Sequence, residues 1–240
     1  MTESKTDKAM IKFPIILVDP GHGVNTPGKR SPDAANGRND SPLYFREYSW
    51  ARKCACGICD VLQAEGYTAF LLVKEEEDVP LSERTKRIKS YCNAYGTENI
   101  IVLSVHVNAA GSDNTWRDAR GLAIYTSPGK TKSDALATCI YDAAVEELIE
   151  RKYGHPYGNT FGPDSGKQKP IRADWSDGDP DFEAAFWMLT KHPAVSVLVE
   201  HMFQDNKEDV RWLKSDAGLG ACIQFDVQGI ENYINKFWKK

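Results

Sequence analysis

Hydrophobic positions along the chain follow two patterns. Short, nearly continuous apolar runs, such as Ile15–Val18 and Ile100–Val105, are typical of strands that are covered on both faces of a parallel sheet. Longer segments have apolar residues at every third or fourth position, as at Trp50, Cys54 and Ile58, which indicates helices that bury one face. The two patterns alternate from end to end.

This alternation predicts an α/β fold. Strands are expected at 14–19, 67–73, 99–106, 121–126, 169–173 and 194–200. Helices are expected at 46–65, 80–95, 131–151, 181–190, 206–214 and 217–238. We therefore predict one twisted, mostly parallel sheet of six strands, with right-handed crossovers and helices on both faces.

Length and composition are consistent with a single domain. The chain has 240 residues, of which 41% are hydrophobic, so it can bury a full core. With no repeat and no linker, residues 13–240 are expected to form one domain behind a polar extension, residues 1–12. A net charge of −4 argues against a nucleic-acid partner, and no apolar run nears the ~18 residues of a transmembrane segment. We expect a monomer.

Polar residues stand where several predicted elements meet one edge of the sheet. His22 follows the first strand in "VDPGHG", His106 ends "NIIVLSVH", and Glu200 ends "AVSVLVE". Glu47 opens the next helix after the first strand, and such a helix starts near the carboxyl edge of the strands. We expect the four side chains to meet at this edge, where open α/β sheets place their sites.

Two imidazoles and one carboxylate are the ligand set of a catalytic zinc ion, with a fourth position left for water. His22, Glu47 and His106 are therefore candidate zinc ligands, and Glu200 is the candidate general base. Each residue alone also has an ordinary structural explanation, such as a satisfied polar group after a strand or an acid at a helix N-terminus. Their joint placement favours the zinc site.

The same segments resemble the zinc-dependent N-acetylmuramoyl-L-alanine amidases of the Amidase_3 family. The resemblance rests on "VDPGHG", a Glu opening the next helix, "SVHVNAA" and "AVSVLVEHMFQDN", in the family's order from Ile15 to about Tyr233. It implies hydrolysis of the amide between the lactyl group of N-acetylmuramic acid and L-alanine in peptidoglycan, hence cell-wall degradation. It also implies one zinc ion on His22, Glu47 and His106, with Glu200 as the catalytic carboxylate.

The chain departs from the family in several places. His201 and Met202 stand where the family usually has a small residue and Gly, and we expect no attached wall-binding module. The irregular segment Gly154–Pro180 is longer than in a minimal member. We expect this segment to border the zinc groove and shape substrate choice, with packing on the far side of the sheet as the alternative. Asn108 and Arg172 are candidate substrate-binding residues.

Other candidate sites are less favoured. Cys54, Cys56 and Cys59 lie on one predicted helix but point in different directions, so we expect free thiols instead of a metal site. The stretch "DGDPDFE" resembles a calcium loop but lacks its sharp-turn Gly and its bidentate Glu, and a turn and helix cap are expected there. The remaining histidines, at positions 155, 192 and 201, are expected to be exposed or structural. Arg84 could hold a substrate carboxylate, although a structural ion pair is favoured.

Two other functions stay open. A zinc peptidase acting within the stem peptide would use the same metal chemistry, although the HExxH helix is absent. A peptidoglycan-binding module without catalysis would not need all four chemical positions filled. The first residues, MTESKTDKAM, have no apolar segment that predicts a signal peptide. We expect synthesis in the cytoplasm with release by another agent, as for a phage lysin, or secretion if a signal has been removed.

Overall fold

The computed structural model describes residues 14–150 and 171–238. The strands are β1 (Ile15–Pro20), β2 (Thr68–Leu71), β3 (Ile100–Asn108), β4 (Ala123–Thr126), β5 (Phe182–Glu183) and β6 (Val195–Phe203). The α-helices are α1 (Pro32–Ala35), α2 (Glu47–Ala64), α3 (Leu81–Tyr95), α4 (Lys132–Val145), α5 (Trp187–Thr190), α6 (Lys207–Leu213) and α7 (Asp216–Phe237). A 3₁₀ turn, η1 (Thr97–Asn99), precedes β3, and a π-helical turn, η2 (Glu146–Glu150), extends α4.

All six strands form one sheet in the order β2-β1-β3-β6-β4-β5. Four neighbouring strands, β2, β1, β3 and β6, run parallel to one another. Strand β4 runs antiparallel to β6, and β5 pairs in parallel with β4. The predicted fold class is therefore confirmed: a single, mostly parallel six-stranded α/β sheet. The expected N-terminal extension, residues 1–12, lies outside the described residues.

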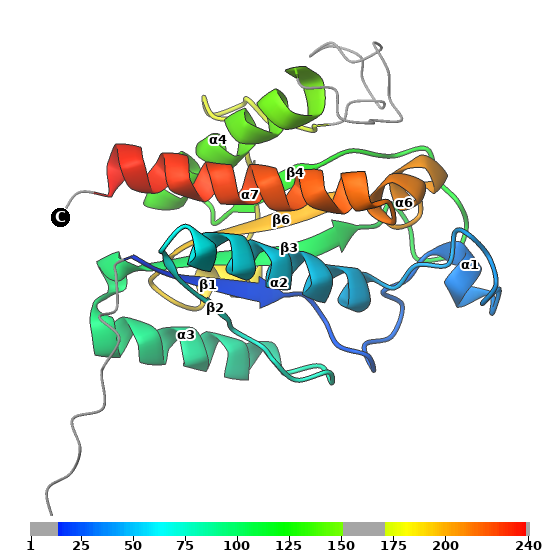
Figure 1. The fold of residues 1–240 in the computed structure, drawn as a ribbon, viewed down its shortest axis with the longest axis horizontal. Helices are drawn as coiled ribbons and strands as arrows, with labels where there is room; N and C mark the ends of the chain where they lie inside the picture. The colour runs from blue at the N-terminus through cyan, green and yellow to red at the C-terminus, as the bar shows by residue number, and fades with distance from the viewer. Residues whose placement is uncertain (1–13, 151–170, 239–240) are drawn as a thin grey trace, which may run out of the picture.

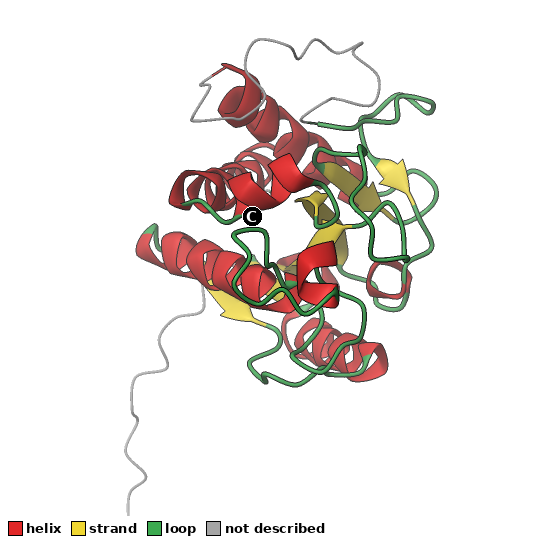
Figure 2. Cartoon of the chain, turned by 90° about the vertical axis from the view of Figure 1, so that its right-hand side faces the viewer, coloured by secondary structure: helices red, strands yellow, loops and turns green. Residues whose placement is uncertain are grey.

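Helices cover both faces of this sheet, as predicted (Figures 1 and 2). On one face α2, α4 and α7 bury the larger core, which includes Ile16, Leu103 and Val199. On the other face α3 and α5 bury a smaller core around Leu17 and Ile88. Helices α2 and α7 lie side by side in Figure 1. No described helix combines the length and the apolar character that crossing a bilayer requires.

The predictions for two elements beside the outer strand β4 are wrong. Within the described residues, the strand expected at 169–173 is reduced to one isolated bridge between Ile171 and Leu122. The helix expected at 181–190 begins instead with β5, and only its last residues form α5. Phe182 packs its ring 5.4 Å from the Tyr125 ring of β4. Pairing with the outer strand β4 therefore overrides the local helical pattern.

The carboxyl ends of β1, β3 and β6 lie at one edge of the sheet. The chain leaves β1 through Gly21, whose N–H donates to the Val105 carbonyl at 2.9 Å. Helix α2 begins at the same edge and runs back over the sheet, burying Trp50, Cys54 and Ile58 on the side that the sequence predicted. Its first residue is Glu47, so Glu47 is brought to the end of β3.

Candidate functional site

Glu47 lies between two histidines. Its Oε1 is 3.2 Å from His22 Nε2 and 3.2 Å from His106 Nδ1. The same oxygen accepts a hydrogen bond from the Val107 main-chain N–H at 3.0 Å. One donor atom from each of the three ligand candidates lies within 4.8 Å of the others. The three side chains can therefore reach a single ion.

Two backbone features of the "PGHG" turn make this approach possible. A Cβ on Gly21 would lie 2.4–2.8 Å from three atoms of the His106 ring, so a side chain at position 21 would displace the ring. His22 itself has φ 62, a left-handed conformation that non-glycine residues rarely adopt. The turn thus presents the His22 ring at the sheet edge, with the rings of His22 and His106 edge to face and 4.9 Å apart.

The fully buried Arg84 of α3 supports the "PGHG" turn through hydrogen bonds. Its guanidinium donates to the Asp19 carboxylate at 2.7 Å, to the Pro20 carbonyl at 2.7 Å and to the His22 carbonyl at 3.2 Å. The ion pair with Asp19 agrees with the structural alternative that the sequence favoured for Arg84. Five hydrogen bonds fix the guanidinium, because it also donates to Val79 and Asp78.

The donor set fits a divalent cation. The second carboxylate oxygen of Glu47, Oε2, is buried and has no hydrogen-bond partner among the described residues, a costly arrangement that a cation would relieve. Burial lowers the pKa of His106 and so favours the neutral imidazole, which is the form that binds metals. Burial also raises the pKa of Glu47, but hydrogen bonds from His106 and His22 outweigh it and hold that pKa below its usual range.

Glu200 stands beside this group on the neighbouring strand. It is the register partner of His106 in the pairing of β3 with β6. Burial, and then the charge of Glu47, raise the pKa of Glu200 to about 8, while Lys29 lowers it. Its Oε2 has no hydrogen-bond partner in the described part of the chain. A carboxyl with a pKa near neutrality is suited to accept a proton and release it again.

Asn108 and Arg172 lie on the Glu200 side of the group, around Tyr125. Burial, and then the charge of Glu200, raise the pKa of the Tyr125 hydroxyl, whereas the Asn108 side chain and the charge of Arg172 lower it. The Arg172 guanidinium carbon is 5.5 Å from the centre of the Phe203 ring at the end of β6. Sequence reasoning missed Tyr125, because its position depends on the antiparallel pairing of β4 with β6.

A cavity of about 370 Å³ opens beside the two histidines. Its walls include His22 and His106, together with Asp78 of the loop before α3 and Leu81, the first residue of α3. Half-exposed Leu81 gives this wall an apolar rim. The cavity offers space for a substrate next to the candidate ligands.

The irregular segment is only partly described, since its residues 154–170, including His155, lie outside the described residues. In the described part, Arg172 donates its main-chain N–H to the Leu122 carbonyl at 2.7 Å, next to β4. Trp175 instead packs edge to face against Tyr141 of α4, with ring centroids 5.7 Å apart. Arg172 thus lies beside β4, whereas Trp175 packs against a helix. The expected role in substrate choice stays a prediction.

The remaining candidates from the sequence have structural roles. Cys54, Cys56 and Cys59 do not converge, and all six cysteines, each of them in the described part of the chain, are free. Asp181, expected to cap a helix, instead accepts a hydrogen bond from Thr126 of β4. His192 is buried, and its Nε2 is 2.7 Å from the Met188 carbonyl.

His201 is also buried, as a structural role requires, but its partner was not foreseen. It points into the α7 side of the sheet, away from Glu200, as strand alternation predicted, and bonds Asp226. Asp226 stands among the buried apolar residues of α7, Cys222 and Ile230 included. A charged residue inside an apolar helical stripe is the sequence signal that could have identified it.

The chain is similar to proteins described as N-acetylmuramoyl-L-alanine amidases. A family model described as N-acetylmuramoyl-L-alanine amidase matches residues 16–232. N-acetylmuramoyl-L-alanine amidase AmiC of Neisseria meningitidis serogroup B is 22% identical over 245 aligned positions, which cover 92% of this chain and 53% of that protein. The chain therefore spans about half the length of this relative.

Two solved structures are similar to the fold. The amidase AmiC2 of Nostoc punctiforme matches with a TM-score of 0.66 and 20% identity, covering 92% of this chain and 97% of that chain. An N-acetylmuramoyl-L-alanine amidase from Clostridium difficile 630 matches with a TM-score of 0.67 and 16% identity, covering 93% and 97%. At these identities the likeness establishes the fold alone.

Proposed function

Because the chain belongs to the Amidase_3 family of N-acetylmuramoyl-L-alanine amidases, we propose that it hydrolyses the amide bond between the lactyl group of N-acetylmuramic acid and L-alanine in peptidoglycan. The observation that carries this proposal is the convergence of His22, Glu47 and His106 beside Glu200. Residues 13–240 act as the catalytic domain.

His22, Glu47 and His106 would hold one zinc ion, each through one atom of the converging set. Two imidazole nitrogens and one carboxylate oxygen are a ligand set that catalytic zinc sites use. The unpartnered Glu47 Oε2 and the neutral form of His106 support this assignment. Zinc bound there supplies a Lewis acid, which polarises the scissile carbonyl and lowers the pKa of a water molecule.

Glu200 moves the proton. It accepts a proton from the water whose oxygen attacks the lactyl carbonyl carbon. The carbon–nitrogen bond then breaks, and Glu200 delivers the proton to the L-alanine nitrogen, which leaves as an amine. The products are a lactyl carboxylate on the glycan and a stem peptide with a free N-terminus.

Asn108 and Arg172 bind the substrate on the Glu200 side. Arg172 carries a positive charge close to Tyr125, and a guanidinium can pair with a carboxylate of the stem peptide in two parallel hydrogen bonds. Asn108 offers an amide that can bond a peptide group beside the scissile bond.

Mass spectrometry of digested peptidoglycan tests the proposal by identifying the broken bond. We expect stem peptides that begin with L-alanine, and turnover that stops with a chelator and returns with zinc. Release of an internal amino acid would indicate a peptidase, and intact peptidoglycan with zinc-loaded protein would indicate a binding module. His22→Ala should lose zinc and turnover together, whereas His192→Ala, which removes a buried histidine away from the site, should lose neither.

A further inference from the structure

A second buried histidine bonds the main chain of the candidate ligand His106. His201 of β6 and Asp226 of α7 are both fully buried. The His201 ring is 2.8 Å from Asp226 Oδ2 through Nε2, and 3.2 Å from the His106 carbonyl oxygen through Nδ1. One imidazole thus connects a helix on one face of the sheet to the strand end that carries His106.

The partners fix the protons of this ring. A main-chain carbonyl can only accept, so Nδ1 of His201 must carry a proton and donate it to His106. The other nitrogen, Nε2, faces Asp226 Oδ2 at 2.8 Å. Because both nitrogens have defined partners, the ring has one orientation in which both bonds can form.

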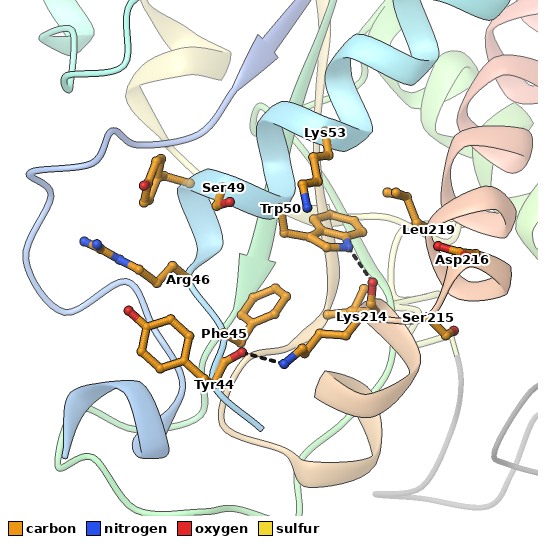
Figure 3. A pocket seen from close by; sticks show the side chains of 12 residues that line it. Tyr44, Phe45, Arg46, Ser49, Trp50, Lys53, Lys214, Ser215, Asp216 and Leu219 are labelled. Carbon is orange, nitrogen blue, oxygen red and sulfur yellow. Dashed lines mark hydrogen bonds between the residues drawn. The ribbon is translucent and has the colours of Figure 1, made fainter. Parts of the chain in front are cut away.

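Aromatic neighbours hold the ring in that orientation. The Phe225 ring stacks on His201 at 5.6 Å, and the Trp50 ring lies 5.2 Å away on α2. Trp50 is itself fixed, because its indole N–H donates to the Leu213 carbonyl at 2.8 Å (Figure 3). Trp50 also forms part of the wall of a separate cavity of about 460 Å³.

These residues do not form a second metal site. Cys54, His201 and Asp226 each place a possible donor atom within 4.8 Å of the others. However, both nitrogens of His201 already bond protein atoms. Burial raises the pKa of the Cys54 thiol far above its usual value, which disfavours the thiolate that a metal would need. A hydrogen-bonded network explains the cluster without an ion.

The network ends on the same peptide group that Glu47 contacts. The carbonyl of the His106–Val107 peptide is bonded by His201, and the N–H of that peptide donates to Glu47 Oε1 at 3.0 Å. Because a peptide unit is planar, these two bonds together set the tilt of the plane. They therefore set the direction in which the His106 side chain leaves the backbone.

The strand pairing at this point needs such support. The register between β3 and β6 shifts between His106 and Asn108. On the other strand Met202 adopts φ 64, a left-handed conformation. The regular ladder is thus interrupted where the site is built, and the His201 side chain provides a bond at the interruption.

We propose that His201, oriented by Asp226, is a positioning residue that aims His106 at the metal by holding the His106–Val107 peptide between itself and Glu47. The proposal rests on the proposed metal site but not on the identity of the bond that is hydrolysed. The partners of a metal-bound histidine beyond the ion usually change metal affinity or activity about 10–100-fold when they are removed, and the same range is expected here.

The test uses His201→Phe, which keeps a ring between Trp50 and Phe225 but removes both nitrogens. His201→Asn is the conservative variant, because its amide N–H can replace Nδ1 as a donor to His106. His192→Phe is the matched control, since it removes another buried histidine with a main-chain partner, located before β6 at the opposite end of the strand from Glu200. Zinc affinity is measured by competition with a chelator, and the visible spectrum is recorded with cobalt in place of zinc.

We expect His201→Phe to weaken zinc binding about 10–100-fold, to change the cobalt spectrum and to lower kcat more than it raises KM. His201→Asn should recover part of the affinity, and His192→Phe should bind zinc like the wild type. Wild-type affinity and spectrum in His201→Phe, or an equal loss in His192→Phe, would overturn the proposal. If His201→Phe does not fold, Asp226→Asn gives the same test.

The two proposals fail in different ways. Wild-type protein that binds zinc through His106 but cuts another bond would remove the proposed substrate and leave the role of His201 intact. Amidase turnover that is unaffected in both His201→Phe and Asp226→Asn, with unchanged zinc affinity, would remove the role of His201 alone.

Discussion

Replacing Arg84 with methionine should destabilise the fold and loosen the metal site together. Arg84→Met keeps most of the side-chain length but removes all five hydrogen bonds of the guanidinium. It leaves the Asp19 carboxylate, which is 1% exposed, with the Ser104 hydroxyl as its donor at 2.8 Å. Breaking a buried ion pair by removing one partner costs about 3–5 kcal/mol, because the other charge stays buried.

For a domain of this size each kcal/mol lowers Tm by about 2–4 °C, so Arg84→Met should melt roughly 6–20 °C lower than the wild type. Urea unfolding of the metal-free protein measures the loss of stability directly. Zinc content should also fall, because the Pro20 and His22 carbonyls lose their donor and the turn that carries His22 is released. Arg87→Met is the control on the same helix, since its partly exposed pair with Glu75 should contribute only about 0–1 kcal/mol.

A double mutant separates the ion pair from the rest. Adding Asp19→Asn to Arg84→Met removes the stranded charge, so the double variant should be more stable than the sum of the two single losses predicts. A loss below about 1 kcal/mol in Arg84→Met would refute the reasoning, given the 3–5 kcal/mol expected for a broken buried pair. Strict additivity in the double mutant would refute it as well.

Three further predictions concern single residues. Gly21→Ala should weaken zinc binding, measured by chelator competition, because the new Cβ would displace the His106 ring; unchanged affinity would contradict the close approach. Glu200→Gln should keep zinc, measured by metal analysis, but lower kcat about 10²–10⁴-fold; zinc loss would make Glu200 a ligand. Burial raises the pKa of Asp209 from 3.8 to about 7, so the folded state binds more protons than the unfolded state between these values, and stability should fall as the pH rises from about 4 to 7. Urea unfolding at pH 5 and 7.5 should show a smaller fall in stability for Asp209→Asn than for the wild type. The fall should not vanish, because Asp181 and Glu231 also have pKa values of about 7. An equal fall in the variant and the wild type would contradict the prediction.

Most of the fold and the core of the site could be read from local patterns. The period of apolar residues separates strands from helices, and in a parallel α/β sheet every strand ends at the same edge. His22 and His106 follow strands, and Glu47 opens a helix, so their meeting follows from the architecture. The four parallel strands and the long helices agree with the expected elements to within a few residues.

The arrangement of the outer strands β4 and β5 could not be predicted from local patterns, because their pairing is set by contacts distant in sequence. The segment 181–190 has a composition that suits a helix, yet Phe182 packs against Tyr125 of β4 and pairs with it as part of a strand. No local pattern in the sequence indicates that β4 runs antiparallel to β6. The position of Tyr125 beside Glu200 depends on that choice.

The supports of the site also required the tertiary structure. Arg84 and Asp19 are 65 residues apart in sequence, and His201 and Asp226 are 25 apart. Sequence shows that such residues are polar in apolar surroundings and must find partners, but not which partner each one finds. Periodicity acts over a few residues and therefore determined which side chains reach the edge of the sheet. The bonds that aim them join different layers of the fold, and only the packing of those layers decided them.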